Sequence, residues 1–274
     1  MNSDATPDTG DGAAATATAD GPISHGKPRA RRNVLRAALA GTAVLGGGIA
    51  VGALPADAET VSGSTSATPS PSPSPSATER PGTPEEALTE LSKGNRRWRT
   101  LHEQHPHEGA AVRQDLTTSQ HPFALILGCI DSRVPPELVF DQGLGDLMTV
   151  RSAGEVLDEA VLGSVAYGVL ELDIPLVVVL GHQSCGAVKA AVSADETGEE
   201  LPAHIQYIAD AIIPTIDHSV EGDARIAATI DANVRLVRSK LAAEPDLAAK
   251  VKAGEVAIVG ARYDLTTQRV HLLK

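Results

Sequence analysis

The sequence has little of what several large protein classes require. Its 274 residues include only two cysteines, which excludes a disulfide-rich scaffold. It also lacks an excess of basic charge: 23 Lys and Arg face 35 Asp and Glu, and a net charge of −12 argues against a nucleic-acid binder. Residues 1–83 contain no Phe, Trp or Tyr and are mostly of low complexity, so they cannot build a core. Residues 84–274 are enough for one compact domain.

The first 58 residues have the three-part plan of an export signal. The pair Arg31-Arg32 precedes an apolar, glycine-rich run over 37–54, and Ala56-Asp57-Ala58 offers small residues for a signal peptidase. The paired arginines resemble a bacterial twin-arginine signal. We expect cleavage after Ala58 and export of the mature chain. The alternative is an uncleaved membrane anchor, because a run of 18 residues can nearly span a bilayer.

Residues 59–83 are rich in Ser, Thr and Pro, with proline at every second position from Pro69 to Pro75. Alternating proline favours an extended polyproline-II chain. We interpret this segment as a disordered linker, either a spacer that holds the domain away from a membrane or cell wall or a passive leader. The expected organisation is therefore an export signal (1–58), a linker (59–83) and a folded catalytic domain (84–274).

The folded domain alternates strand and helix patterns. Thr83-Pro84-Glu85-Glu86 is a capping box and predicts that a helix begins there. Short apolar runs predict strands at 123–128, 147–150, 176–180 and 256–259, with a further edge strand at 269–273. Helical patterns occupy 156–172, 186–194, 203–217 and 223–243. This order predicts an α/β fold with a mostly parallel β-sheet flanked by helices.

Both cysteines lie where predicted strands end, the edge at which parallel α/β sheets bind ligands. Cys129 follows the strand 123–128, and His182-x-x-Cys185 follows the strand 176–180. Cys and His suit Zn²⁺, and three such ligands would leave a fourth position for water or substrate if the two strands are neighbours. Two alternatives are that the cysteines are free core residues or that they form one disulfide.

A charged pair follows the first cysteine. Asp131 and Arg133 lie two and four residues beyond Cys129. An arginine beside a carboxylate fixes its orientation and keeps it ionised. Such a carboxylate can accept a proton from metal-bound water or ligate the metal itself. The alternative is a salt bridge that only stabilises the loop.

Taken together, the motifs resemble the β-class carbonic anhydrases over nearly all of 84–274. The matching segments are Cys129 to Glu137, Gly181 to Val188, Gly143 to Leu147, Arg151 to Gly154, Gly94 to Trp98 and Gly260 to Leu265. The resemblance implies the family's α/β fold and a zinc ion bound by Cys129, His182 and Cys185. It further implies a catalytic dyad of Asp131 and Arg133, with Asp131 as a possible fourth ligand in a closed state, and substrate binding by Gln120.

The implied activity is reversible hydration of carbon dioxide to bicarbonate and a proton by zinc-bound hydroxide (carbonate dehydratase). Family members are homodimers or dimers of dimers with the active site near the subunit interface. One alternative is a zinc hydrolase acting on carbonyl sulfide or carbon disulfide. Another is a non-catalytic protein with a structural zinc, against which Gln120, Asp131 and Arg133 argue. We expect a bacterial enzyme that is exported or secreted. Its export machinery would carry it in the folded state, with zinc already bound.

Two residues depart from the family's pattern, and one cluster falls outside it. Ile130 stands where Ser is common, and Glu155 stands where Asn is usual and would add negative charge near the site. His102, His105 and His107 are interpreted as part of a solvated loop, the alternatives being a proton shuttle or a second metal site.

Overall fold

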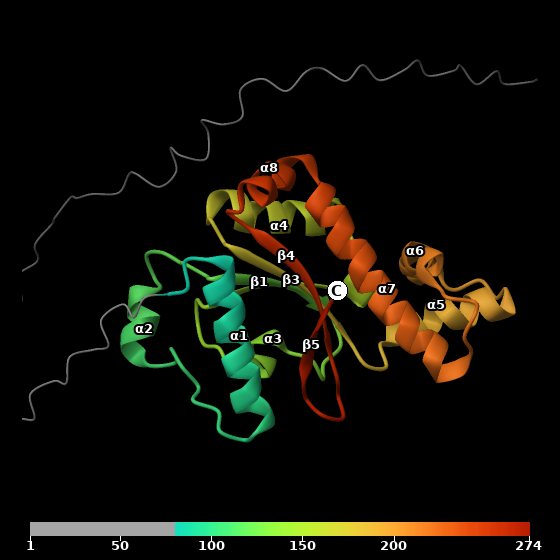
Figure 1. The fold of residues 1–274 in the computed structure, drawn as a ribbon, viewed down its shortest axis with the longest axis horizontal. Helices are drawn as coiled ribbons and strands as arrows, with labels where there is room; N and C mark the ends of the chain where they lie inside the picture. The colour runs from blue at the N-terminus through green and yellow to red at the C-terminus, as the bar shows by residue number, and fades with distance from the viewer. Residues whose placement is uncertain (1–79) are drawn as a thin grey trace, which may run out of the picture. The chain divides into compact units, whose positions relative to one another are not determined.

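The computed structural model describes residues 80–274, and Figure 1 shows their fold. The predicted export signal, its cleavage site and most of the predicted linker lie outside the described residues. In the described part, no helix is both long enough and apolar enough to cross a membrane.

The core of the described part is a five-stranded sheet in the order β2-β1-β3-β4-β5. Its strands are β1 (Ala124–Cys129), β2 (Leu147–Ser152), β3 (Leu176–His182), β4 (Ala257–Tyr263) and β5 (Val270–Leu273). The first four run parallel, and β5 lies antiparallel to β4 at the edge. The predicted α/β fold with a mostly parallel sheet is therefore confirmed.

Helices cover both faces of this sheet. One face packs against α1 (Pro84–Arg99) and α3 (Pro136–Val139), and the other against α4 (Glu159–Glu171), α7 (Gly222–Ala243) and α8 (Pro245–Ala253). Every residue of the central strands β1 and β3 is buried as a result. This explains why both strands read as continuous apolar runs rather than as alternating ones.

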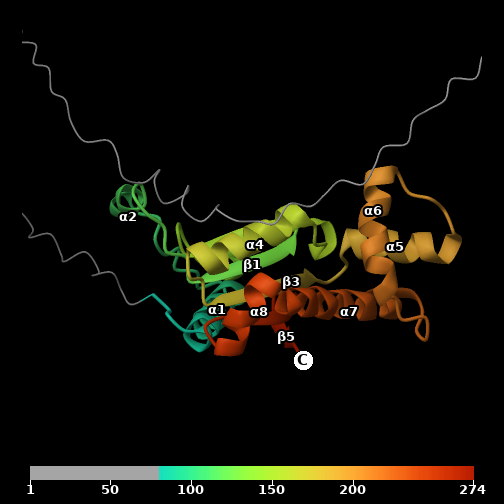
Figure 2. The same cartoon turned by 90° about the horizontal axis from the view of Figure 1, so that it is seen from above.

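The remaining helices lie at opposite ends of the sheet. In both views, α5 (Gly186–Thr197) and α6 (Ala203–Ile212) extend beyond one end, and α2 (Ala110–Asp115) lies beyond the other (Figures 1 and 2). A small core of its own joins α5 and α6 to the sheet, and it includes the two cysteines. The end occupied by α5 and α6 is the one at which β1 and β3 finish, so this end holds the candidate site.

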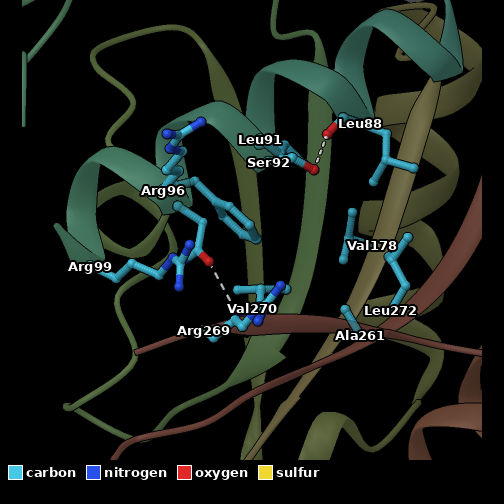
Figure 3. Close-up of a pocket in the computed structure, with 12 residues that line it drawn as sticks. Leu88, Leu91, Ser92, Arg96, Arg99, Val178, Ala261, Arg269, Val270 and Leu272 are labelled. Atoms are coloured by element: carbon cyan, nitrogen blue, oxygen red, sulfur yellow. Dashed lines mark hydrogen bonds between the residues drawn. The ribbon is translucent and has the colours of Figure 1, made fainter. Parts of the chain in front are cut away.

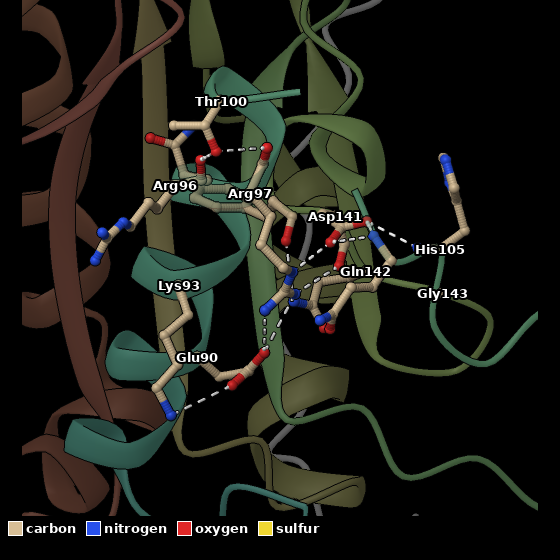
Figure 4. A network of polar contacts seen from close by, with 12 residues as sticks. Glu90, Lys93, Arg96, Arg97, Thr100, His105, Asp141, Gln142 and Gly143 are labelled. Atoms are coloured by element: carbon tan, nitrogen blue, oxygen red, sulfur yellow. Dashed lines mark hydrogen bonds and ion pairs between the residues drawn. The ribbon is translucent and has the colours of Figure 1, made fainter. Parts of the chain in front are cut away.

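Helix α1 is fixed at both ends by polar contacts. The predicted capping box is present: Thr83 accepts from the backbone N–H of Glu86, whose carboxylate accepts from that of Thr83. Near the other end, Arg97 contacts Glu90 on the same helix and the buried carboxylate of Asp141 (Figure 4). Trp98 donates to the hydroxyl of Tyr263 on β4 at 3.0 Å. These contacts place α1 firmly across the sheet.

Candidate metal centre

Three candidate ligands meet at the carboxyl end of the central strands. Cys129 is the last residue of β1, His182 is the last residue of β3, and Cys185 caps the start of α5. Strands β1 and β3 pair directly, which is the condition the sequence analysis required. All three residues are buried, and their ligand atoms lie within 4.8 Å of one another.

The turn between His182 and Cys185 does not depend on a left-handed conformation of its flanking glycines, Gly181 and Gly186. The residue in the left-handed region is Ser184, with φ 57°. Gly181 has another role, because a Cβ there would lie 2.5 Å from the Cγ2 of Val234 on α7. Glycine at position 181 therefore lets α7 pack closely against β3 beside the histidine.

The distance between the two sulfur atoms suits a shared metal ion. They lie 3.9 Å apart, and both cysteines are free. Tetrahedral ligation at a Zn–S distance of about 2.3 Å separates two sulfurs by about 3.8 Å. A disulfide needs about 2.05 Å. The structure therefore holds two thiols at the spacing of a zinc site and not the disulfide considered as an alternative.

The hydrogen bonds of His182 select the nitrogen that faces the cluster. Its Nδ1 lies 3.0 Å from the carbonyl oxygen of Gln183, which can only accept, so Nδ1 carries the proton. Nε2 is buried and has no hydrogen-bond partner. A buried nitrogen without a partner is costly, and a metal ion would satisfy its lone pair. The donor set therefore fits zinc.

The two thiol groups shift each other's pKa in opposite directions. The hydrogen bond between them lowers the pKa of Cys129 and raises that of Cys185. The backbone N–H of Gly154 also donates to the sulfur of Cys129 at 3.4 Å. This contact stabilises the thiolate, the form in which cysteine binds a metal.

The carboxylate of Asp131 is held by Arg133 and lies outside the three-residue cluster. Two parallel bonds join the side chains, Nε to Oδ1 at 2.9 Å and Nη2 to Oδ2 at 2.7 Å. These bonds from Arg133 hold the pKa of Asp131 well below its usual range, so the group is ionised at neutral pH. Its Oδ2 lies 3.8 Å from the Nε2 of His182. The carboxylate of Asp131 thus lies beside the cluster of candidate ligands but is bound to Arg133.

Arg151 is a supporting residue to which the sequence analysis gave no role of its own. It lies on β2 opposite Gly128 of β1. Its Nε donates to the carbonyl of Cys129 at 2.7 Å and its Nη2 to that of Asp131 at 2.6 Å. One guanidinium therefore fixes the backbone at the candidate ligand Cys129 and at Asp131. In the sequence, the one indication of this role is a charged arginine near the end of a largely apolar strand.

Glu155 is buried close to the cluster. It follows Gly154 in a left-handed turn, with φ 54°, and its side chain is 2% exposed. Its Oε1 has no hydrogen-bond partner. Burial, and next the negative charge of Cys129, raises the pKa of Glu155 well above its ordinary value. The carboxyl is thus held toward its neutral form, whereas the sequence analysis expected it to add negative charge.

Within one chain the structure does not bring Gln120 to the cluster. This residue is exposed and precedes β1, while Cys129 ends that strand. Six strand residues rise by about 3.3 Å each, which separates the two ends by roughly 16 Å. The histidines of the nearby loop are also apart from the cluster: His107 binds the buried carboxylate of Asp146 at 2.7 Å, and His102 and His105 are exposed.

Comparisons with known proteins identify the family of this chain. Residues 124–270 match the family model described as carbonic anhydrase. The carbonic anhydrase of Mycolicibacterium smegmatis is 42% identical over 194 residues, which are 69% of this chain and 93% of that protein. Carbonic anhydrase 2 of Mycobacterium tuberculosis is 39% identical over 191 residues, 69% of this chain and 92% of that protein.

Solved structures with the same fold include the β-carbonic anhydrase CcaA and that of Coccomyxa in complex with acetazolamide. The first has a TM-score of 0.57 at 24% identity and covers 68% of this chain and 95% of its own. The second has a TM-score of 0.55 at 24% identity, and the match covers 68% of this chain and 86% of that protein's chain. With the family model spanning both central strands and the candidate ligands, this chain belongs to the carbonic anhydrase family and has the β-carbonic anhydrase fold.

Proposed function

We propose that this protein catalyses the reversible hydration of carbon dioxide to bicarbonate and a proton at a zinc ion held by Cys129, His182 and Cys185. One observation carries the proposal. The unpartnered Nε2 of His182 lies with two buried sulfurs in a three-ligand cluster, and the ionised Asp131 stands beside it without completing the set. Three protein ligands and an open position are the arrangement of catalytic zinc sites.

Bound there, Zn²⁺ would act as a Lewis acid that lowers the pKa of water to about 7, which supplies hydroxide near neutral pH. The protein's own residues then orient the reaction. Asp131 accepts a hydrogen bond from the attacking oxygen and aims its lone pair at the carbon of carbon dioxide. Arg133 keeps that carboxylate ionised and in place, and Arg151 fixes the backbone that carries it.

The variant Asp131→Asn tests this assignment. It keeps all three ligands but weakens the acceptor, so we expect full zinc content and a loss of carbon dioxide hydration of about 100-fold. Cys185→Ala, in contrast, should lose the metal itself. Zinc analysis and stopped-flow hydration assays separate the two outcomes. An Asp131→Asn enzyme as fast as the parent, or a Cys185→Ala protein with full zinc, would falsify the assignment.

The same assay addresses the alternatives. Carbonyl sulfide is a linear molecule that an identical zinc centre can attack, so both substrates should be measured on one preparation. Hydration of carbon dioxide should be the faster reaction. A structural zinc without catalysis is disfavoured because Arg133 occupies the carboxylate of Asp131, and no fourth ligand joins the cluster within residues 80–274.

We further propose a homodimer or dimer of dimers in which Gln120 of one copy completes the metal centre of another. The supporting observation is its place at the far end of β1 from Cys129. Exposed apolar side chains lie at both places: Ile130, 61% exposed, directly follows Cys129, and Leu144, 47% exposed, lines the same surface hollow as Gln120. Two β-carbonic anhydrases of Sordaria macrospora, which have the same fold, are described as tetrameric.

We also propose that the chain is exported by a twin-arginine route and acts outside the cytoplasm or is secreted. An uncleaved anchor remains the alternative. The support is the pair Arg31-Arg32, the apolar run over 37–54 and the small residues Ala56-Asp57-Ala58. Free thiols oxidise outside the cytoplasm, and the proposed ligands must stay reduced until zinc binds them. Export after folding and metal loading satisfies both conditions.

A further inference from the structure

A cavity lies between helix α1 and the sheet, and none of the metal-centre residues lines it. Its volume is about 260 Å³. The wall is largely apolar and comes from α1, three strands and Phe140, which directly follows α3; Figure 3 shows the labelled residues. The apolar residues include Leu88, Leu91, Phe140, Val178, Ala261 and Leu272. An apolar ligand body of modest size can therefore be held here.

Three arginines line the same cavity. Arg96 and Arg99 lie on α1, and Arg269 directly precedes β5 (Figure 3). All three are exposed, and within residues 80–274 none of them forms an ion pair. The cavity lining contains no Asp or Glu. In a chain with a net charge of −12, this is a local concentration of uncompensated positive charge.

The neighbouring Arg97 shows the contrast on the same helix. Its guanidinium faces the other way and meets two carboxylates, those of Glu90 and Asp141 (Figure 4). The arginines of the cavity have no such partners. Like charges around an apolar space repel one another, and a bound anion relieves that repulsion through charge-assisted hydrogen bonds. Guanidinium groups also match the planar, two-oxygen head of a carboxylate.

We propose that this cavity binds an amphipathic carboxylate, with its head among Arg96, Arg99 and Arg269 and its apolar body against the wall of the sheet. Both halves of the site are needed. The arginines alone would take any small anion, and the apolar wall alone would take any small hydrophobe. The ligand would join α1 to the start of β5.

Octanoate is a suitable probe, measured by isothermal titration calorimetry on the full-length, zinc-loaded chain. We expect one octanoate per chain, with acetate and octylammonium at least 10-fold weaker because each lacks one half of the recognition. Trp98 is the single tryptophan of the chain and lies on α1, so its fluorescence should follow the same titration.

The variant Arg99→Gln/Arg269→Gln should weaken octanoate by at least about 10-fold, because it removes charge-assisted hydrogen bonds. Ser92→Phe should also weaken it by filling the cavity while keeping all three arginines. The control is Arg113→Gln, an exposed arginine of α2 outside the cavity, which should bind like the parent. Carbon dioxide hydration should be unchanged in the double variant, which shows that it is folded.

Three results would overturn the proposal. The first is the absence of saturable octanoate binding by the parent. The second is unchanged affinity in Arg99→Gln/Arg269→Gln, which would place octanoate elsewhere, the metal centre included. The third is equal affinity for acetate, which would reduce the site to a nonspecific anion contact.

Discussion

His182 illustrates how much of the metal centre depends on single atoms. The residue is recognisable in the sequence, but the ring nitrogen that faces the cluster is not, because that choice depends on the carbonyl of Gln183. The three candidate ligands could be predicted from the sequence, because each is a Cys or His at or just after the end of a predicted strand. They are Cys129, His182 and Cys185. Arg151 and the protonation of Glu155 were not, since they follow from contacts between β1, β2 and the turn after β2.

Burial of Glu155 predicts a pH-dependent stability. Its pKa is raised in the folded protein, so the unfolded chain releases this proton first as the pH rises. Folding stability should therefore fall above the ordinary glutamate range, by at most about 1.4 kcal/mol per pH unit for one proton. Glu155→Gln removes the ionisable carboxyl and with it this pH-dependent loss of folding stability. Its melting temperature, relative to that of the zinc-loaded parent, should rise between pH 5 and pH 8.

The exposed Glu171 provides the control for this measurement. Glu171→Gln makes the same substitution at an exposed carboxyl, and the pH trend of Glu155→Gln is compared with it. If the two variants follow the same trend, the carboxyl of Glu155 is not held neutral.

At the level of elements, apolar patterns were sufficient for the sheet and the longer helices. All five strands and α1, α4, α5 and α7 lie where they were predicted, with ends moved by a few residues; β4, for example, continues to Tyr263. The short helices α2, α3 and α8 were missed because they have too few turns to show a period. The pattern over 203–217 was too long, since α6 ends at Ile212 and a tight turn containing Pro214 follows.

The close packing of α7 on β3 makes Gly181 a sensitive position. A methyl group there would lie 2.5 Å from Val234 and 3.3 Å from Ile230, both buried. We expect Gly181→Ala to destabilise the protein by about 1–3 kcal/mol and to weaken zinc binding by displacing the adjacent His182. Chemical denaturation and zinc titration measure the two effects.

A matched glycine is available on α4. Gly163 has open space around its Cα, so Gly163→Ala should be neutral or stabilising through its better helix propensity. Val234→Ala should rescue Gly181→Ala in part. If Gly181→Ala is as stable as the parent, the contact between α7 and β3 is less tight than the structure indicates.

For the whole molecule, the proposed sharing of Gln120 predicts complementation. Gln120→Ala and Asp131→Asn should each be slow as pure proteins. A mixed assembly contains sites in which Asp131 comes from one variant and Gln120 from the other, so activity should return on subunit exchange. Stopped-flow assays before and after exchange give the measurement, and the parent mixed with Asp131→Asn is the control. Additive, unrestored activity would contradict the shared site.

The export proposal has its own test at this scale. Arg31→Lys/Arg32→Lys should retain the protein in the cytoplasm with its zinc and activity intact. Fractionation followed by zinc analysis would show this. Normal export of the double variant would contradict a twin-arginine route and would leave the survival of the two thiols to another mechanism.

The candidate ligands and Asp131 are held by different parts of the fold. Metal affinity and turnover therefore depend on different segments of the chain. Cys129, His182 and Cys185 belong to strand ends and a helix start, so their spacing is inherited with the sheet. Asp131 lies on the loop that follows, held there by Arg133 and Arg151. Changes in that loop can retune turnover while metal affinity is conserved. A related protein in which this loop had changed its geometry would still bind zinc but would no longer catalyse the reaction.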